Sequence, residues 1–261
     1  MEELEGRVAL VTGGGRGIGA AIARDLAARG AEVVVSSRTQ SDLEAVVDSI
    51  VSAGGRGHAR VTDAMDRDQV RALGLHTLEA CGRVDILVNN VGGASSVAPG
   101  PDVDLDDAFL GGLTLNLLSA VWLSHTVLPA MREAGDGRII NIGSGVSKRT
   151  GGPLSYVTAK HGLVGFTRQM AADEAMAGIT VNCVCPGWTE TSLLDWDEIG
   201  AAMGGTRVEA RAYAESESLQ RRVLAPEELC GMVGLLASSS GAGITGQVIS
   251  VDGGLHEAFL R

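Results

Sequence analysis

The sequence predicts a single α/β domain in which helices cover both faces of a doubly wound parallel sheet. Short apolar runs of strand type recur along the 261 residues, and longer segments with helical spacing of apolar residues separate them. Runs that are apolar on both faces are typical of strands in a parallel sheet covered by helices. The length also lies within the range of one large domain.

Each element is expected from its own segment. The apolar runs predict strands at Val8–Val11, Val33–Val35, Ile86–Val88, Ile139–Ile142, Ile179–Val184 and Val248–Val251, with a further short strand before Asp63. Helical spacing predicts helices at Ala20–Arg29, Leu43–Ala53, Gln69–Ala80 and Tyr156–Met176. Right-handed crossovers place ligands beyond the carboxyl ends of such strands, so functional residues are expected directly after them.

The composition of the chain limits which binding partners and which cellular compartment we expect. The formal net charge is −11, with 32 acidic against 21 basic residues, which argues against a nucleic-acid binder because phosphate neutralisation needs a cationic face. The four cysteines show no spacing typical of a metal site, and Cys183 and Cys185 lie in an apolar run that predicts buried thiols. The first ten residues do not resemble a signal peptide, so we expect a reduced, cytoplasmic protein.

Two segments have alternative interpretations. The run from Ala108 to Met131 has no charged residue, as a membrane helix would. It also contains Asn116, His125 and Pro129, which favour a buried or interface helix in a protein without membrane contact. The less regular segment 189–222 predicts a small helical substrate lid. A surface insertion without ligand contact is the alternative.

The segment from Thr12 to Ala20 is rich in glycine and lies between the first strand and a helix. Glycine permits positive φ and lets backbone N–H groups approach a pyrophosphate at a helix N-terminus. Two registers match this pattern, GxGxxA on Gly15, Gly17 and Ala20 or GxxxGxG on Gly13, Gly17 and Gly19. The position between strand and helix makes the segment a predicted dinucleotide site.

The end of the second predicted strand indicates which dinucleotide binds. A site that selects NAD usually has an acidic residue there for the ribose 2′-OH, but this chain has Ser36-Ser37-Arg38. Arg38 and Arg16 would hold a 2′-phosphate by charge-assisted hydrogen bonds. Each arginine alone could be a solvated surface charge, but together they predict NADP(H).

Tyr156 and Lys160 are four residues apart at the start of a predicted helix, so they share one face. An unperturbed phenol titrates near pH 10, and a neighbouring ammonium favours its ionised form. The pair is therefore a candidate proton donor and acceptor near neutral pH. Ser144 follows the fifth strand and offers a hydroxyl for a substrate carbonyl.

With these motifs in order, the chain resembles the classical short-chain dehydrogenases/reductases, which have a single-domain Rossmann fold. The matching motifs are TGGGRGIG at 12–19, NNVG at 89–92, Asn116, NIGS at 141–144, YVTAK at 156–160, VNCVCPG at 181–187, and ITGQ at 244–247 with VDGG at 251–254. They extend over nearly the whole chain.

The resemblance implies a role for each matching residue. Tyr156 would be the general acid in ketone reduction, Lys160 would bind the nicotinamide ribose, Ser144 would orient the carbonyl and Asn116 would hold a water in a proton relay. Asp63 and Ala64 would contact adenine, although a lone Asp at this point is otherwise a turn or cap residue. The implied cofactor-binding residues are Gly13, Gly15, Arg16, Gly17, Ile18, Ser37, Arg38, Asp63, Ala64, Asn90, Gly92, Tyr156, Lys160, Pro186, Gly187 and Thr189.

The resemblance leaves some alternatives open. Ser144 precedes Tyr156 by 12 residues, one fewer than the family pattern, so Ser147 remains an alternative for the serine role. The segments KHGLVGFT and CPGW are similar to type II polyketide ketoreductases and to 3-hydroxybutyrate dehydrogenases. The arginine pair favours an NADPH-dependent ketoreductase over an NAD-linked dehydrogenase of a small hydroxy acid or a non-catalytic dinucleotide sensor. The family also implies a homodimer or homotetramer, with substrate specificity in segments 93–103, 145–155 and 189–222.

Overall fold

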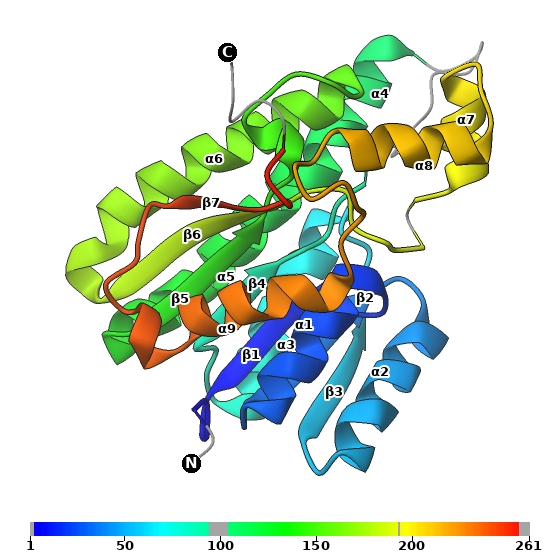
Figure 1. The fold of residues 1–261 in the computed structure, drawn as a ribbon. Coiled ribbons are helices and arrows are strands. Elements are labelled where there is room, and N and C mark those ends of the chain that lie inside the picture. The colour runs from blue at the N-terminus through cyan, green and yellow to red at the C-terminus, as the bar shows by residue number, and fades with distance from the viewer. Residues whose placement is uncertain (1–2, 94–103, 193, 256–261) are drawn as a thin grey trace.

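The computed structural model describes residues 3–93, 104–192 and 194–255. Seven strands form one parallel sheet in the order β3-β2-β1-β4-β5-β6-β7 (Figure 1). The strands are β1 (Val8–Thr12), β2 (Glu32–Ser37), β3 (Arg56–Val61), β4 (Ile86–Asn89), β5 (Gly137–Ile142), β6 (Ile179–Pro186) and β7 (Val248–Val251). The order reverses between β1 and β4, which confirms the predicted doubly wound sheet and places the ligand-binding crevice at the ends of these two strands.

Two layers of helices enclose the sheet. On one face, α1 (Gly17–Ala28), α2 (Gln40–Ser52) and α9 (Cys230–Ala237) share a hydrophobic core with one side of the strands. On the other face, α3 (Arg67–Cys81), α5 (Ser119–Ala134) and α6 (Leu154–Glu174) form a second core. The central strands are buried on both sides, as their unbroken apolar runs predict. Cys183 and Cys185 on β6 are buried, also as predicted.

The six strands expected from apolar runs are present, and β3 shows why the seventh was harder to locate. It forms an edge of the sheet and pairs with β2 alone. Its sequence RGHARV is mostly exposed, so burial does not impose an apolar pattern on it. Polar and charged side chains on an edge strand also discourage pairing with other chains.

The uncharged segment expected as one helix is three consecutive elements. They are α4 (Leu105–Leu113), a π-helical turn at Thr114–Leu118 and α5. Together, Leu105–Ala134 are long and apolar enough to cross a membrane by length and composition alone, and 33% of the most apolar window is buried inside the protein. One side of α5 packs against α3 and the sheet, so its apolar residues have a role in the core of this domain.

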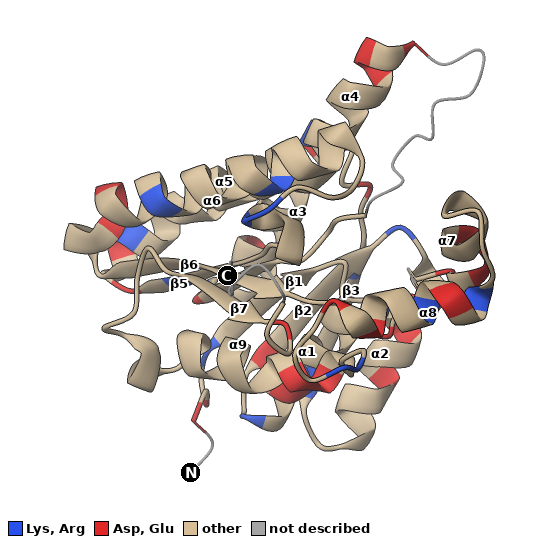
Figure 2. Ribbon diagram, turned by 45° about the horizontal axis from the view of Figure 1, so that its top comes forward, with Lys and Arg blue, Asp and Glu red and all other residues tan. Residues whose placement is uncertain are grey.

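The segment after β6 contains two short helices, α7 (Trp196–Ala202) and α8 (Arg207–Ser216). They form a small hydrophobic cluster of their own in which Trp196, Ala210 and Ala214 are buried. Figure 2 shows α7 and α8 on one side of the molecule and α4 projecting at the top, with acidic residues on α1, α2 and α8. We call residues 189–222 the lid, after the role that their sequence predicts. Short 3₁₀ turns at Gly145–Ser147, Ala175–Ala177, Pro226–Leu229 and Ser239–Gly241 complete the described elements.

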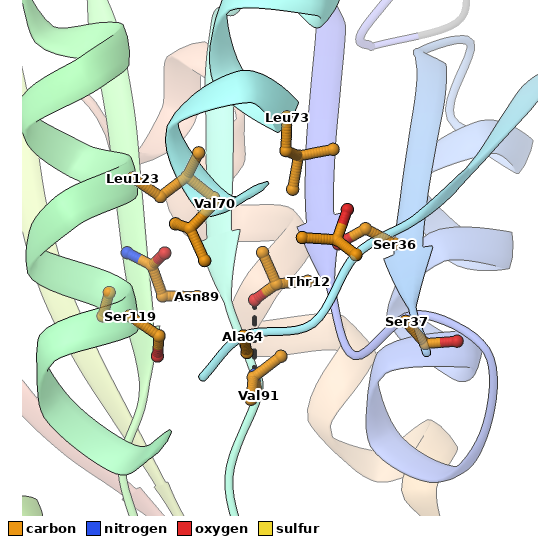
Figure 3. Close-up of a pocket in the computed structure, with 12 residues that line it drawn as sticks. Thr12, Ser36, Ser37, Ala64, Val70, Leu73, Asn89, Val91, Ser119 and Leu123 are labelled. Atoms are coloured by element: carbon orange, nitrogen blue, oxygen red, sulfur yellow. Dashed lines mark hydrogen bonds between the residues drawn. The ribbon is translucent and has the colours of Figure 1, made fainter. Parts of the chain in front are cut away.

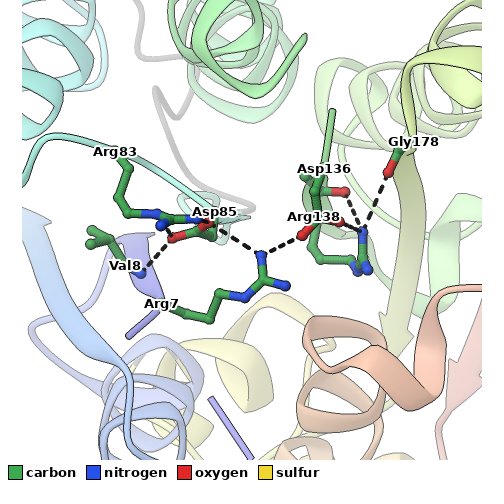
Figure 4. Close-up of polar contacts among 8 residues, drawn as sticks. Arg7, Val8, Arg83, Asp85, Asp136, Arg138 and Gly178 are labelled. Carbon is green, nitrogen blue, oxygen red and sulfur yellow. Dashed lines mark hydrogen bonds and ion pairs between the residues drawn. The ribbon is translucent and has the colours of Figure 1, made fainter. Parts of the chain in front are cut away.

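A network of ion pairs joins the amino-terminal ends of three central strands, at the edge opposite the crevice (Figure 4). Asp85 is 2% exposed and accepts hydrogen bonds from the Val8 amide at 2.8 Å and from Arg83 Nε at 2.8 Å. Arg7 pairs with both Asp85 and Asp136, and Asp136 also accepts from Arg138 at 2.5 Å. Ion pairs and hydrogen bonds of this network therefore connect the amino-terminal ends of β1, β4 and β5.

Candidate functional site

The glycine segment after β1 forms a tight turn that leads directly into α1. Gly13 and Gly17 have φ angles of +62° and +55°, which favour glycine over residues with a Cβ. A Cβ on Gly15 would lie 2.9 Å from Ser37 Oγ, and one on Gly17 would lie 3.1 Å from Thr191 Cγ2 of the lid. The missing side chains leave the backbone N–H groups at the N-terminus of α1 accessible at the crevice, as a pyrophosphate site requires.

Asn90 connects this turn to the end of β4. Its side-chain Nδ2 donates to the carbonyl oxygens of Thr12 at 3.0 Å and Gly13 at 3.2 Å, and its backbone amide donates to Thr12 Oγ1 at 3.0 Å. A Cβ on Gly19 would come within 2.4 Å of Asn90 Nδ2. Asn90 therefore holds the glycine turn in place, a supporting role that the sequence motif alone did not reveal.

Two arginines stand beside the glycine turn, at the end of β2 and before α1. Arg16 and Arg38 are both exposed, and neither has an ion pair with a carboxylate among the described residues. Ser37 directly precedes Arg38, and its hydroxyl donates weakly to Thr39 O at 3.4 Å. The two guanidinium groups thus remain available for an anion at the end of β2.

Asp63 and Ala64 follow β3, as expected. Asp63 Oδ1 accepts from the Met65 amide at 2.9 Å, and the Asp63 amide donates to Gln69 Oε1 at 3.0 Å. The carboxylate therefore shapes the turn before α3, which is the role a lone Asp in a turn usually has. This turn brings Asp63 and Ala64 to the same edge of the sheet as the glycine turn.

A small cavity lies beneath these turns, and Figure 3 shows its lining. Its volume is about 20 Å³, which is room for about one water molecule. It is therefore too small for an adenine ring, and a dinucleotide would lie above it along the strand ends. The residues that line it are Thr12, Ser36, Ser37, Thr62, Ala64, Val70, Leu73, Asn89, Val91, Ser119, Ala120 and Leu123.

The structure brings Tyr156 and Lys160 together on the first turns of α6. The Lys160 ammonium lies 5.7 Å from the centre of the Tyr156 ring. Lys160 is 3% exposed, and its Nζ donates to Ile142 O at 2.8 Å at the end of β5. Tyr156 is half-buried. The ammonium thus has a fixed place beside a phenol that remains in contact with the crevice.

Asn116 lies in the π-helical turn before α5, and its side chain lies close to Lys160 of α6. Its Oδ1 accepts from the Gly93 amide at 2.9 Å, and its Nδ2 donates to the carbonyl oxygens of Gly93 at 3.1 Å and Gly112 at 3.0 Å. A Cβ on Gly92 would lie 2.8 Å from Asn116 Oδ1 and 3.1 Å from Lys160 Nζ. Asn116 and Lys160 therefore meet at Gly92, where only glycine leaves enough space. π-turns often occur at functional sites because they change the direction of one side chain.

Ser144 and Ser147 differ in how their hydroxyl groups are used. Ser147 is 3% exposed, and its Oγ accepts from the Ser144 amide at 3.0 Å. Ser144 is half-buried and caps the 3₁₀ turn, with its Oγ accepting from the Val146 amide at 3.4 Å. Ser144 therefore has the more accessible hydroxyl.

Pro186, Gly187 and Thr189 lie where β6 leads into the lid. The Gly187 amide donates to Val251 O at 3.1 Å, and Thr189 Oγ1 donates to Gly187 O at 3.0 Å. Thr189 also pairs with Leu224, two residues beyond the lid. These contacts fix where the chain leaves β6 and where it returns after the lid.

A buried polar network supports the site from below, and the sequence motifs had not singled it out. Asn89 Nδ2 donates to Ser124 Oγ at 3.1 Å and to Asn141 Oδ1 at 2.9 Å. Asn141 Nδ2 then donates to Thr167 Oγ1 at 2.9 Å. Polar residues inside apolar strands and helices were the available signal, because such residues are buried only with partners. The network joins β4, β5, α5 and α6.

Comparison of the chain with known proteins identifies the family to which it belongs. The model of the short chain dehydrogenase family matches residues 7–198. The chain belongs to this family. Its members are oxidoreductases that bind a nicotinamide dinucleotide, which agrees with the glycine turn at the end of β1.

Three similar proteins are informative. The short-chain reductase protein NovJ of Streptomyces niveus is 37% identical over 95% of this chain and 93% of its own length. The 3-oxoacyl-(acyl-carrier-protein) reductase of Escherichia coli is 37% identical, over 97% and 98% respectively. A variant of actinorhodin polyketide ketoreductase, solved with NADPH, is 34% identical and superposes with a TM-score of 0.87 over 95% and 96% of the two chains. These relatives are all named as reductases, and two of them as reductases of keto groups.

Proposed function

We propose that the protein is an NADPH-dependent ketoreductase that reduces a ketone to an alcohol, with Tyr156 as the general acid. The observation that carries this proposal is that Lys160 lies beside Tyr156 and meets Asn116 at Gly92, at the carboxyl ends of the strands. The solved ketoreductase with NADPH supports the reaction type. A polyketide-derived ketone is the substrate class that this relative suggests.

Each residue has a separate task in this proposal. Tyr156 donates the proton to the carbonyl oxygen, and Ser144 orients that oxygen. We assign this role to Ser144 because its hydroxyl is more accessible than that of Ser147. Lys160 stabilises the negative charge that develops on the phenol oxygen. Asn116 holds the loop at Gly92 and Gly93 against this pair. NADPH, when bound, supplies the hydride.

The residues beside the glycine turn support NADPH as the cofactor. Gly13, Gly15 and Gly17 leave space for a pyrophosphate. Arg16 and Arg38 have no carboxylate partner among the described residues, and a 2′-phosphate would neutralise them.

The test of this proposal is a comparison of kcat/KM with NADPH and with NADH on a panel of ketones. We expect a preference for NADPH. Because a charged hydrogen bond contributes about 1.5–3 kcal/mol, Arg38→Ala should lower kcat/KM for NADPH by roughly ten- to a hundredfold and leave the value for NADH nearly unchanged. A wild-type preference for NADH, or equal losses with both cofactors, would contradict the assignment.

We also propose that the protein forms a homo-oligomer through α5 and α6. A groove of about 460 Å³ lies between these helices and is lined by Val121, His125, Leu128, Pro129, Arg132, Phe166, Gln169, Met170, Asp173 and Glu174. Its centre is apolar and its far end is charged, which is the usual arrangement of a protein interface. A second copy related by a twofold axis would present the same helices in return.

A further inference from the structure

Glu217 accepts hydrogen bonds from two side chains that are distant in sequence and from one in the preceding helix. It follows α8 directly, at the end of the second lid helix. Arg149, two residues after the 3₁₀ turn that Ser144 caps, donates through Nη1 to Oε1 at 2.7 Å and through Nη2 to Oε2 at 3.1 Å. Trp188 Nε1 donates to Oε2 at 2.7 Å, and Tyr213 Oη donates to Oε1 at 3.1 Å.

The Arg149–Glu217 pair is shielded from solvent. Both side chains are 14% exposed, so water screens the pair less than an ordinary surface pair. Burial acts to raise the pKa of the Glu217 carboxyl, but the hydrogen bonds from Arg149 and Trp188 outweigh it and hold this pKa below its usual value. A two-point contact between a guanidinium and a carboxylate also fixes relative orientation.

The residues after Glu217 make a second connection to the serine loop. The Leu219 amide donates to Gly254 O at 2.8 Å, and Ser218 pairs with Leu255 in an antiparallel bridge. Leu255 packs so closely on Gly145, the neighbour of Ser144, that a Cβ there would lie 2.5 Å from Leu255 Cδ1. The end of α8 therefore contacts the serine loop both by charge and by packing.

We propose that Glu217 is a positioning residue that fixes the lid relative to the loop carrying Ser144, and thereby determines which face of the ketone is reduced. Trp188 follows the Pro186-Gly187 junction, so the carboxylate joins the segment that leaves β6 to the serine loop that follows β5. This inference rests on the proposed ketoreductase function. If the connection were lost, the lid and the serine loop would move independently and a ketone would bind in more than one orientation.

The lid contains a matched control. Glu190 accepts from Trp196 Nε1 at 2.9 Å and from Arg211 Nη1 at 2.8 Å. It is therefore also a carboxylate between a tryptophan and an arginine, but both partners belong to the lid. Glu190→Gln tests how the internal stability of the lid affects ketone binding and the enantiomer ratio. Glu217→Gln tests how the connection between the lid and the serine loop affects the same two quantities.

The experiment compares wild type, E217Q, R149Q, the E217Q/R149Q double variant and E190Q. Reduction of ethyl 3-oxobutanoate and of 1-tetralone with NADPH gives kcat, KM and the enantiomer ratio of each alcohol. Hydrogen exchange of the free proteins is followed in residues 145–150 and 207–217. The exchange measurement does not depend on activity.

We expect E217Q and R149Q each to raise KM for the ketone about tenfold and to lower the enantiomer ratio, with KM for NADPH unchanged. The double variant should have the same KM for the ketone and the same enantiomer ratio as either single variant, because the two residues act as a pair. E217Q should speed exchange in both segments, and E190Q in 207–217 alone.

Two results would overturn the proposal. One is an E217Q enzyme with the KM and enantiomer ratio of E190Q. The other is unchanged exchange in 145–150 when Glu217 is replaced. A wild-type protein that reduces no ketone with either cofactor would refute the ketoreductase function instead, and the exchange data would still decide whether Glu217 joins the two segments.

Discussion

Tyr156 and Lys160 can act on one reaction centre in the proposed mechanism because an α-helix places residues four apart on the same face. The sheet adds what the helix cannot supply. The Ile142 carbonyl, at the end of β5, holds the Lys160 ammonium by a 2.8 Å hydrogen bond. Lys160 is 3% exposed, and a buried ammonium interacts more strongly with a neighbouring phenol than a solvated one would.

Replacement of Tyr156 by Phe removes the proposed proton donor and leaves the ring. We expect kcat for ketone reduction to fall by about 10²- to 10⁴-fold, the usual contribution of a general acid. NADPH binding, measured by titration of cofactor fluorescence, should be nearly unchanged. Thr158→Ala, at an exposed position of the same helix, should keep wild-type activity. Full turnover of Tyr156→Phe would exclude this residue as the acid.

At the scale of elements, features set by local sequence could be predicted and features set by distant contacts could not. The glycine turn, the buried strands and the Tyr156–Lys160 pair depend on neighbouring residues, so their positions were predicted closely. The π-turn at Thr114–Leu118 depends on how Asn116 reaches the Gly93 backbone, 23 residues away. The contact of Arg149 with Glu217 spans 68 residues, and no sequence pattern indicates it.

The α5–α6 groove carries a prediction about assembly. Size-exclusion chromatography with light scattering should show a dimer or tetramer. His125 is exposed and lines the groove, so His125→Glu should shift the population toward monomer by adding a charge to an interface that contains each residue twice. His76→Glu, on the exposed side of α3, is the matched control. A wild-type protein that is monomeric at all concentrations would contradict the proposed assembly.

At the scale of the whole molecule, the ion pairs and the candidate site lie at opposite edges of one sheet. The amino-terminal ends of the strands are stabilised by the ion pairs of Arg7, Asp85, Asp136 and Arg138. The glycine turn, the serine loop and the lid lie at the carboxyl ends. Changes at the amino-terminal edge are therefore expected to alter stability and leave catalysis unaffected.

The pH dependence of stability follows from Asp136. Burial opposes ionisation of this carboxyl, but Arg7 and Arg138 outweigh burial and lower its pKa in the folded protein. A lowered folded-state pKa stabilises the protein above the unfolded value of about 3.9, and this contribution is lost as the pH falls through the folded-state pKa. At pH 7, Asp136→Asn should lower Tm by roughly 2–4 °C. The difference from wild type should become smaller as the pH falls below about 4.

Calorimetry of the two proteins across this pH range measures the effect. Asp48→Asn, at an exposed position of α2, should show little change at either pH. Equal Tm differences at pH 7 and pH 3 would mean that Asp136 acts through something other than its charge.

The π-turn at Thr114–Leu118 also limits how the length of this helix can change. Such a turn contains one residue more than the α-helical turn it replaces. Deleting one residue there would restore regular α-helical geometry but would change the direction in which Asn116 projects from the helix. Its hydrogen bonds to the Gly93 backbone would then be lost. We therefore expect a change of length to be tolerated less well here than in an exposed loop.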